Sequence, residues 1–308
     1  MPAPSSSILP HLEVRLGPVE TTGTGVACPV LAGEQAESLF PRAQAAGCSG
    51  GFAFYQSGDW LLGHAAVPIA ADLEEATRRL YLGLLRALGG HLLARVWNYV
   101  PAINAQSAAG LENYRAFCRG RSLAFEEQFG AAFPRHAPAA SAVGCEDDRL
   151  SLVFAAHAGA ASHVENPRQL PAYAYPPEHG PRAPTFARAT RVDLGTRRRA
   201  VFISGTAAIR GHASVAPGRT LPQLECTLEN LREISVACGL GPDLAAGCAE
   251  ERFFKVYLRH AEDLAAVRAR LEDALIRAGD RVTYLRADIC RAELNVEIEA
   301  TLPAVALE

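Results

Sequence analysis

The sequence is poor in several features that mark whole classes of protein. Its 308 residues contain a single lysine, Lys255, and the formal net charge is −3, so no basic surface points to a nucleic-acid partner. No stretch reaches the roughly 18 apolar residues that a membrane-spanning helix needs. The N-terminal MPAPSSSILPHLEV lacks the basic and apolar regions of a secretory signal. We therefore expect a cytoplasmic protein that binds neither nucleic acid nor membrane.

Motifs that carry familiar chemistry are also missing. GxGxxG, the P-loop, HExxH and GxSxG do not occur, so nucleotide-binding, zinc-protease and serine-hydrolase functions lack their signatures. The cysteines are scattered without a CxxC pair, which favours free thiols over disulfides or a zinc site. We expect no metal and no organic cofactor. The eight cysteines are Cys28, Cys48, Cys118, Cys145, Cys226, Cys238, Cys248 and Cys290.

What remains is a globular composition, with 49% apolar and 20% charged residues, arranged as an internal repeat. Each half has strands, an amphipathic helix, another strand, a second helix and two final strands. In the second half, the two final strands are expected to be joined by a short turn. The second half's elements are predicted at 199–209, 220–240, 251–260, 263–279, 281–290 and 294–302; those of the first half at 52–70, 72–90, 91–104, 110–130 and 140–158.

This pattern predicts an α/β (α+β) fold with two pseudo-symmetric sheet-and-helix halves. We place the N-terminal half at 1–160, a connector at 161–187 and the C-terminal half at 188–308. The connector is rich in proline, which precludes regular helix or central strand there. Its aromatic residues indicate that it packs on the body of the protein, because flexible linkers are poor in such residues.

Two glutamates in the last strand distinguish the second half from the first. Glu297 and Glu299 share one face of the strand, while Val296 and Ile298 share the other. The corresponding strand of the first half, RLSLVFAA, has no carboxylate. The pair is either the solvated face of a sheet or the single functional site of a duplicated fold.

A second candidate surface lies on the helix at 110–130. Tyr114 and Arg121 are seven residues apart, so their side chains emerge on the same face, with Phe117 and Cys118 between them. A phenol and a planar guanidinium aligned in this way can grip a carboxylate. The alternative is an amphipathic rim with a solvated arginine.

The segment before the last strand carries a further group of polar residues. Arg286, Asp288 and Cys290 share strand parity, and seven residues separate Cys290 from Glu297 across the expected turn. The two could therefore face each other on neighbouring strands, as a catalytic pair or as a cross-strand contact without a role. In SGTAAIRGH, Gly205 indicates either a close approach to a ligand or a tight turn.

The second half resembles the RidA-like enamine/imine deaminase fold, related in architecture to the chorismate-mutase-like fold. The shared features are the FISG strand, the TLENLREISVACGL helix, KVYLRHAEDLAAV and the terminal VEIEA, over about 190–302. In that family the first Glu of EIEA handles the catalytic water, which corresponds here to Glu297.

A narrower resemblance, to the chorismatases, covers nearly the whole chain. It rests on VWNYVPAIN, GLENYRAFCRGRSLAFE, ENPRQLPAYAYPPEHGPRAPTFARA, SGTAAIRGHAS and CRAELNVEIE, which occur in that order. The resemblance implies a duplicated RidA-like fold that cleaves the enolpyruvyl ether of chorismate and releases pyruvate. A duplicated unit can satisfy internally the interfaces of a RidA trimer, so we expect a monomer or weak oligomer.

The chorismatase resemblance also implies roles for individual residues. Glu297 becomes the general acid, and Tyr114 and Arg121 become ligands of a substrate carboxylate. Arg286 or Arg259 is the candidate for the second carboxylate, and Gly205, Thr206 and Ala207 are further substrate-binding candidates. Cys290 is similar to the residue of members that make 3-hydroxybenzoate.

Several functional alternatives remain open on the sequence alone. Ala207 and Ala208 depart from the glycine that 3-hydroxybenzoate formers prefer, which leaves room for members that also make 4-hydroxybenzoate. A hydrolase giving 3,4-dihydroxycyclohexa-1,5-dienoate is another possibility. A RidA-type enamine/imine deaminase and a non-catalytic chorismate sensor complete the alternatives.

Overall fold

The structure is a computed structural model, and it describes residues 12–306 apart from 18–24, 38, 41, 70–71, 108–109, 196 and 248–250. Within these residues, no helix is both long enough and apolar enough to cross a membrane. Seven of the cysteines are described, and all seven are free thiols; Cys248 lies outside the described residues.

The first half of the chain forms a six-stranded sheet. Its parallel pair is β8 with β9, and the remaining neighbours are antiparallel. Helices α1 (Leu73–Ala87) and α2 (Asn113–Phe129) belong to this half, and the 3-10 helix η1 (Gly130–His136) follows α2. The strand order is β5 (Gln44–Ser49), β6 (Phe52–Ser57), β7 (Trp60–Pro68), β10 (Arg149–His157), β8 (Leu92–Pro101) and β9 (Ala139–Cys145).

The second half forms a seven-stranded sheet with the same central arrangement. Its parallel pair is β16 with β17, in the positions that β8 and β9 hold in the first sheet. Helices α3 (Thr220–Ala237) and α4 (Leu264–Ala274) accompany it, with η4 (Ala261–Asp263) before α4. The order is β11 (Ala161–Val164), β12 (Ala189–Asp193), β13 (Arg198–Ala207), β18 (Val296–Ala306), β16 (Phe253–Leu258), β17 (Arg281–Arg286) and β3 (Val30–Ala32).

Because the orders β6-β7-β10-β8-β9 and β12-β13-β18-β16-β17 correspond strand by strand, the predicted pseudo-symmetric fold is confirmed. Strand β11 holds the edge position that β5 holds in the first sheet, and β3 is the one described strand that is added to the second sheet. A small sheet of β1 (Val14–Leu16), β2 (Gly25–Val26) and β4 (Ala36–Glu37), a hairpin of β14 (Ile209–Arg210) and β15 (Ala213–Ser214), and the 3-10 helices η2 (Ala172–Ala174) and η3 (Pro177–His179) complete the described elements.

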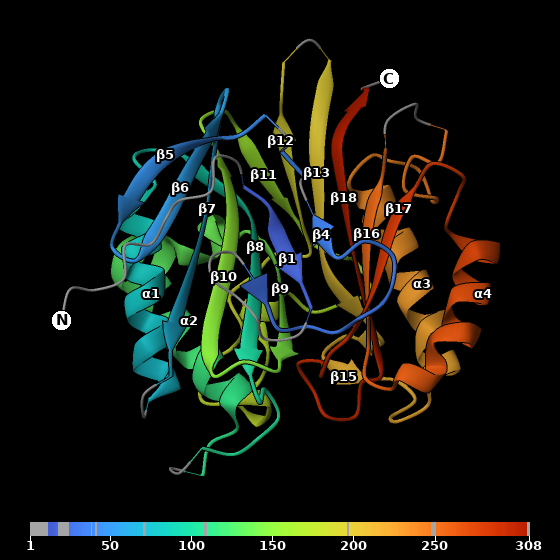
Figure 1. Ribbon diagram of the computed structural model, residues 1–308. Helices are drawn as coiled ribbons and strands as arrows, with labels where there is room; N and C mark the ends of the chain where they lie inside the picture. Colours follow the sequence, from blue (N-terminus) through green and yellow to red (C-terminus); the bar gives the residue numbers. More distant parts are fainter. Residues whose placement is uncertain are drawn as a thin grey trace.

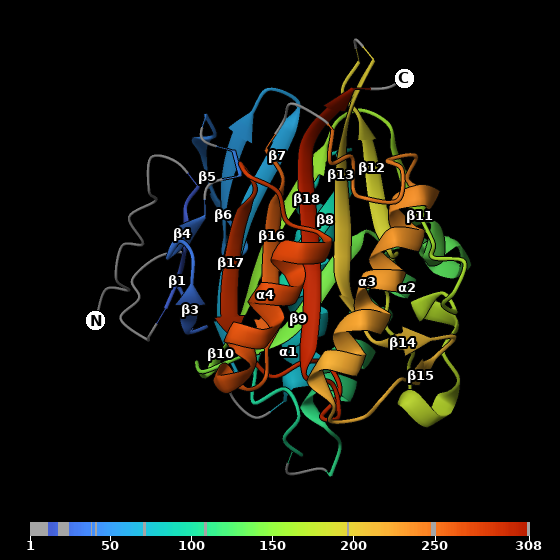
Figure 2. The same ribbon diagram turned by 90° about the vertical axis from the view of Figure 1, so that its right-hand side faces the viewer.

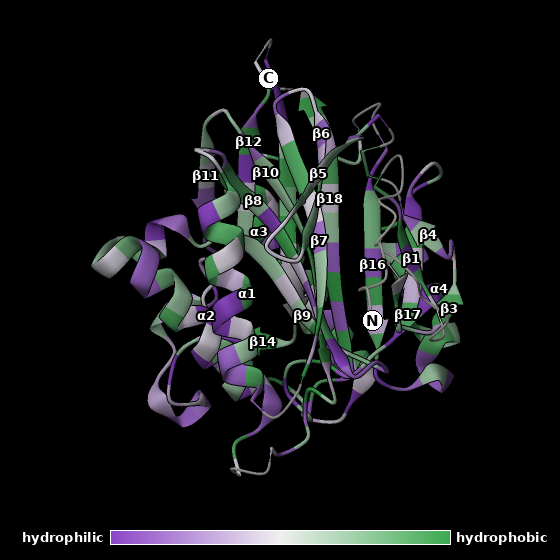
Figure 3. Ribbon diagram, turned by 60° about the vertical axis from the view of Figure 1, so that its left-hand side comes forward, coloured by the Kyte–Doolittle hydropathy of each residue, from purple (hydrophilic) through white to green (hydrophobic). Residues whose placement is uncertain are grey.

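The molecule has four layers, with α1 and α2 on one side, α3 and α4 on the other, and the two sheets between them (Figure 1). Turned by a quarter, the view shows α3 and α4 covering the outer face of the second sheet (Figure 2). Separate clusters of buried side chains fill the space between each helix pair and its sheet, and a third fills the space between the sheets. The strands are accordingly rich in hydrophobic residues, whereas α1 and α2 also carry hydrophilic positions (Figure 3).

Local signals in the sequence account for some of the helix ends. The side chain of Asp72 accepts a hydrogen bond from the N–H of Glu75 at the start of α1. Gly239 follows α3 with a φ of 74°, the left-handed conformation that glycine adopts at helix C-termini. Asp263 precedes α4 as predicted, but its carboxylate accepts from the hydroxyl of Thr220 at 2.6 Å and does not cap the helix.

Helix α4 is shorter than predicted, because it ends at Ala274 and not at Gly279. Buried Arg252 donates to the carbonyl oxygen of Leu275 at 3.0 Å and to the carboxylate of Asp280 at 2.8 Å. These bonds tie the chain after α4 to the start of β16, and Leu275, with a φ of −136°, has already left the helical conformation.

The expectation that the last two strands are neighbours is wrong. Strand β16 lies between β17 and β18 in the sheet, parallel to β17 and antiparallel to β18. The predicted strand at 281–290 ends at Arg286, so Cys290 lies in the loop 287–295. Any contact between Cys290 and Glu297 therefore depends on this loop and not on strand pairing.

Candidate active site

A cavity of about 260 Å³ opens where the two halves of the chain meet. A smaller pocket of about 40 Å³ adjoins it and shares six of its lining residues. The walls come from α2, from the connector between the halves, from β13 and from the loop that precedes β18. The shared residues are Tyr114, Pro184, Phe186, Gly205, Cys290 and Glu297.

Glu297 lies at the start of β18, and its side chain reaches both parts of the cavity. The residue is 3% exposed, and its Oε1 has no hydrogen-bond partner among the described residues. A Cβ atom on Gly205 would lie 1.9 Å from that oxygen. Of the two interpretations of Gly205, a close approach is therefore correct. The group that approaches the glycine, however, is the carboxyl of Glu297 and not a ligand.

The surroundings of Glu297 favour its protonated form. Burial, reinforced by the negative charge of Glu299, raises its pKa to about 8, although Arg95 and Arg188 act in the opposite direction. A carboxyl that keeps its proton near neutral pH can act as a general acid.

Glu299, two residues further on the same face, has a different environment. Arg95 donates to its Oε2 at 2.6 Å and Trp97 to its Oε1 at 2.6 Å, while Tyr257 donates to Oε2 at 3.1 Å. Although burial opposes ionisation, Arg95 and Lys255 outweigh it and hold the pKa of Glu299 below its usual value. The surroundings of the two glutamates therefore favour the protonated acid at Glu297 and the ionised carboxylate at Glu299.

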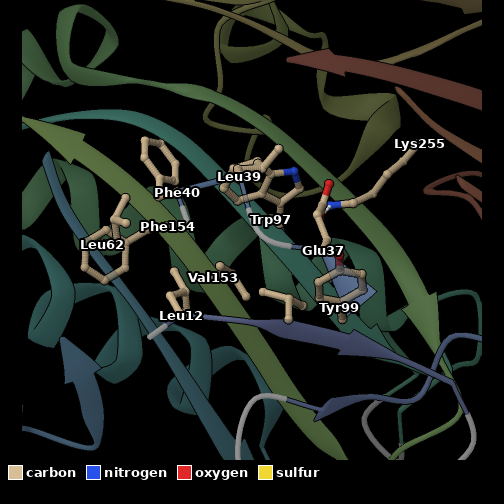
Figure 4. Close-up of a pocket in the computed structure, with 11 residues that line it drawn as sticks. Leu12, Glu37, Leu39, Phe40, Leu62, Trp97, Tyr99, Val153, Phe154 and Lys255 are labelled. Atoms are coloured by element: carbon tan, nitrogen blue, oxygen red, sulfur yellow. Dashed lines mark ion pairs between the residues drawn. The ribbon is translucent and has the colours of Figure 1, made fainter. Parts of the chain in front are cut away.

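The charge network around Glu299 continues into the N-terminal segment. Lys255 lies 3.4 Å from Glu299 and 2.6 Å from Glu37 of β4. Figure 4 shows Glu37 and Lys255 pointing toward each other beside Trp97 and Tyr99, in a small pocket lined mainly by apolar side chains. The solvated-face interpretation of the glutamate pair is therefore wrong, because the first half of the chain covers this face.

Arg121 and Tyr114 lie on one face of α2, as the spacing predicts, and both line the smaller pocket. Arg121 is 2% exposed, and its guanidinium lies over the rings of Tyr81 and Phe125, at 5.0 and 5.8 Å from their centroids. Its Nε and Nη2 have no hydrogen-bond partner among the described residues. A buried cation with unpartnered donors is suited to binding an anion.

A second buried arginine, Arg188, lines the larger part of the cavity. Its Nη2 donates to the carbonyl oxygen of Leu170 at 3.0 Å and to the hydroxyl of Tyr175 at 2.8 Å. Its Nε has no partner among the described residues. Arg188 and Arg121 therefore offer unpartnered guanidinium donors to one continuous cavity.

The two arginines that the sequence nominated for the second carboxylate lie elsewhere. Arg286 is half exposed and pairs with Glu146 at the surface. Arg259 binds Asp288 and Asn104 and donates to the carbonyl oxygens of Ile289, Arg291 and Leu294. Neither residue is among those that line the cavity. Arg259 instead holds the loop that carries Cys290.

Cys290 and Glu297 both line the two parts of the cavity, although they are not on neighbouring strands. Burial, followed by the charge of Glu297, raises the pKa of the Cys290 thiol. Cys290 is therefore a neutral thiol at physiological pH and not a thiolate nucleophile. On β13, Gly205 and Ala207 line the cavity, whereas Thr206 turns away and donates to the carbonyl oxygen of Ser204 at 2.9 Å.

Several cavity residues escaped the sequence reasoning. Arg188, Tyr175 and His179 belong to the connector or its end, where no periodicity indicates which side chains point inward. Arg115 and Arg291 directly follow the predicted site residues Tyr114 and Cys290 in the sequence, and this adjacency is the signal that could have identified them. The other missed lining residues include Glu112, Phe186 and Glu293.

Comparison with known proteins identifies the family of the chain. The family model described as the N-terminal part of FkbO/Hyg5-like chorismatases matches residues 39–156. A 3-hydroxybenzoate synthase from Streptomyces hygroscopicus is 38% identical over 82% of this chain and 76% of that protein. A chorismatase from Streptomyces rapamycinicus is 39% identical over 83% of this chain and 78% of its own length.

A solved structure extends the similarity to three dimensions. The crystal structure of a chorismatase covers 98% of this chain and 95% of its own, with a TM-score of 0.81 and 30% sequence identity. The sequence similarity spans most of both chains, and the structural similarity spans nearly all of them. The chain belongs to the chorismatase family of enzymes.

Proposed function

We propose that this protein cleaves the enolpyruvyl ether of chorismate to give pyruvate and 3-hydroxybenzoate. The observation that carries the proposal is a buried Glu297 with an unpartnered Oε1, in the same cavity as two buried arginines with unpartnered donors. Burial and Glu299 favour the protonated form of this carboxyl. The name of the relative that is a 3-hydroxybenzoate synthase supports the choice of product.

Chorismate carries two carboxylates, and the cavity offers two buried cations. Arg121, with Tyr114 beside it on α2, is assigned to one carboxylate. Arg188, oriented by Tyr175, is assigned to the other, in place of Arg286 or Arg259. Each charge-assisted contact contributes about 1.5–3 kcal/mol, which suffices to fix the orientation of the substrate.

Glu297 is assigned the first chemical step. Its carboxyl proton goes to the terminal methylene carbon of the enol ether, which makes an oxocarbenium ion stabilised by the adjacent ether oxygen. The resulting Glu297 carboxylate remains next to the cation and lowers its energy. Glu299 stays ionised throughout, because its Arg95, Trp97 and Lys255 contacts favour that form.

The fate of the oxocarbenium ion decides the product. Attack by the ring hydroxyl of the substrate transfers the bond within the molecule, and loss of pyruvate with aromatisation then leaves hydroxybenzoate. Chorismate equals hydroxybenzoate plus pyruvate atom for atom, so this route consumes no water. Cys290, as a neutral thiol in the cavity wall, is assigned to steer this attack or to relay a proton during aromatisation.

Incubation of the purified protein with chorismate, followed by chromatography of the products, tests the proposal. We expect pyruvate and 3-hydroxybenzoate in equal amounts, and a loss of about 10²–10⁴-fold in kcat for Glu297→Gln. Near-normal turnover by Glu297→Gln would remove the assignment of the acid. Tight binding of chorismate without turnover would indicate a sensor, and turnover of imines alone a deaminase.

The proposal extends to the organisation of the protein. Both walls of the cavity come from one chain, which supports a monomer or weak oligomer. The proposed location is the cytoplasm, and the proposed partner is the substrate chorismate. The boundaries 1–160, 161–187 and 188–308 describe the two halves and the connector. Strands β3 and β11 extend the second sheet from outside the C-terminal half so defined.

A further inference from the structure

A second group of chemistry-bearing side chains lies at the wall of the cavity. Glu178 and His179 come from η3 of the connector, and His212 comes from the turn between β14 and β15. Their potential ligand atoms lie within 4.8 Å of one another. Of the three residues, His179 also lines the cavity.

Although the sequence predicts no metal site, we propose that Glu178, His179 and His212 form a binding site for a divalent transition-metal ion of the zinc class. The ion would join the connector to the β14–β15 hairpin. This site is separate from Glu297 and Cys290, and its occupancy does not depend on the proposed reaction.

The distances among the three ligand atoms suit such an ion. His179 Nε2 lies 2.9 Å from His212 Nδ1, and Glu178 Oε1 lies 3.5 and 3.4 Å from these two nitrogens. Atoms with these separations can all lie about 2.0–2.2 Å from one central ion, the usual length of zinc bonds to nitrogen and oxygen. Two imidazoles and a carboxylate leave a fourth tetrahedral position for water.

The backbone already holds the two segments together without an ion. The N–H of Leu170 donates to the carbonyl oxygen of Gly211, and the N–H of Gly211 donates to that of Arg168, both at 2.9 Å. Gly211 has a φ of 58°, which makes the turn that presents His212. The hairpin lies beside the connector at the lower right of Figure 2. Little rearrangement is therefore needed to bring the ligands together.

Nearby charges set the expected strength of binding. Arg115 and Arg291 lie close enough to His179 to oppose a cation, but Arg115 pairs with Glu112 at 3.3 Å. The Glu178 carboxylate compensates part of the remaining charge, and it is well exposed to solvent. We therefore expect weaker affinity than that of a closed structural zinc site with four protein ligands.

Titration of the untagged, metal-free protein with Zn²⁺ and Co²⁺ tests the site. We expect one equivalent to bind and the melting temperature to rise with metal concentration. Loss of an outer-shell partner already costs roughly 10–100-fold in metal affinity, so His212→Ala should cost at least that. His212→Gln tests the same point with a side chain that retains polarity, should the alanine variant be unstable.

Controls separate this cluster from other donors. His260→Ala removes an exposed histidine elsewhere and should leave binding unchanged. The Co²⁺ complex should show tetrahedral absorption without a thiolate charge-transfer band, which excludes Cys48 and Cys290 as ligands. Absence of one-equivalent binding at roughly 100 µM metal, or equal binding by wild type and both His212 variants, would overturn the proposal.

Discussion

Glu297 and Glu299 point to the same side of β18 and are equally buried, yet their environments favour opposite charge states. Glu299 accepts hydrogen bonds from Arg95, Trp97 and Tyr257, whereas Oε1 of Glu297 has no partner among the described residues. The ionised neighbour also makes ionisation of Glu297 harder. The second glutamate thereby helps to keep the proton on the first.

This relationship predicts the pH dependence of the reaction. Because the acid must carry its proton, kcat/KM should fall as the pH rises through the pKa of Glu297, about 8. Initial rates of pyruvate release from subsaturating chorismate between pH 6 and 10 measure this limb. A flat profile across this range would contradict Glu297 as the acid.

The same pKa predicts a pH dependence of stability. In the unfolded chain Glu297 ionises near 4.5, and in the folded protein near 8, so the folded state binds more protons between these values. The free energy of unfolding of the wild type, relative to Glu297→Gln, should therefore decrease as the pH rises from about 4.5 to about 8. Denaturant melts of both proteins at several pH values measure this difference in the free energy of unfolding. An increase in the difference between these pH values would contradict the raised pKa of Glu297.

Gly205→Ala should reduce activity through Glu297. The added Cβ would lie 1.9 Å from Oε1 and 2.6 Å from Cδ of Glu297, so the carboxyl must move. A displacement of about 1 Å in an active site can cost roughly 10²-fold in rate. Steady-state kinetics measure the loss. Gly247→Ala is the matched control, because a Cβ there meets no atom within 4 Å, and its activity should be unchanged.

Arg121→Lys and Arg188→Lys should each raise KM for chorismate. Both variants keep a positive charge but lose the planar donors that match a carboxylate. A lost charge-assisted contact corresponds to roughly tenfold or more in kcat/KM. Arg286→Ala, at the surface pair with Glu146, should leave the kinetics unchanged. Normal KM in both lysine variants would show that the cavity cations do not bind substrate.

Cys290→Ala should change the identity of the product more than the rate of pyruvate release. If the thiol directs attack by the ring hydroxyl, its loss should let water compete, so hydroxybenzoate falls and the dihydroxy diene acid appears. Chromatography against a pyruvate assay separates the two effects. Cys238→Ala, in the core beside α3, should keep the wild-type product. An unchanged hydroxybenzoate yield would make Cys290 a packing residue.

Periodicity in the sequence predicted the repeated fold, because each helix and strand buries one face against its own half. It did not predict the burial of Glu299, since the residues that satisfy this carboxylate, Arg95 and Trp97, lie 204 and 202 positions away. Whether a polar strand face is solvated or covered depends on the other half of the molecule, and a local pattern carries no such information.

The site was predictable to a similar degree. Helix geometry correctly placed Tyr114 and Arg121 on one face. The prediction that Cys290 and Glu297 lie in one site rested on a pairing of neighbouring strands, and those strands are not neighbours. The loop that Arg259 holds places Cys290 in the cavity with Glu297. Arg188 was missed, since it follows an irregular connector whose inward side only tertiary packing determines.

The duplicated fold places both walls of the candidate active site in one chain. Both sheets, and the walls of the cavity, come from one chain, so the assembly of the cavity is a folding event. Dilution cannot separate its walls, and specific activity should not depend on enzyme concentration. The two inner faces can also diverge independently, since a substitution in one is not copied into the other. In this chain the second sheet carries the acid Glu297, and the first sheet carries Arg95, which favours the ionised form of the neighbouring Glu299.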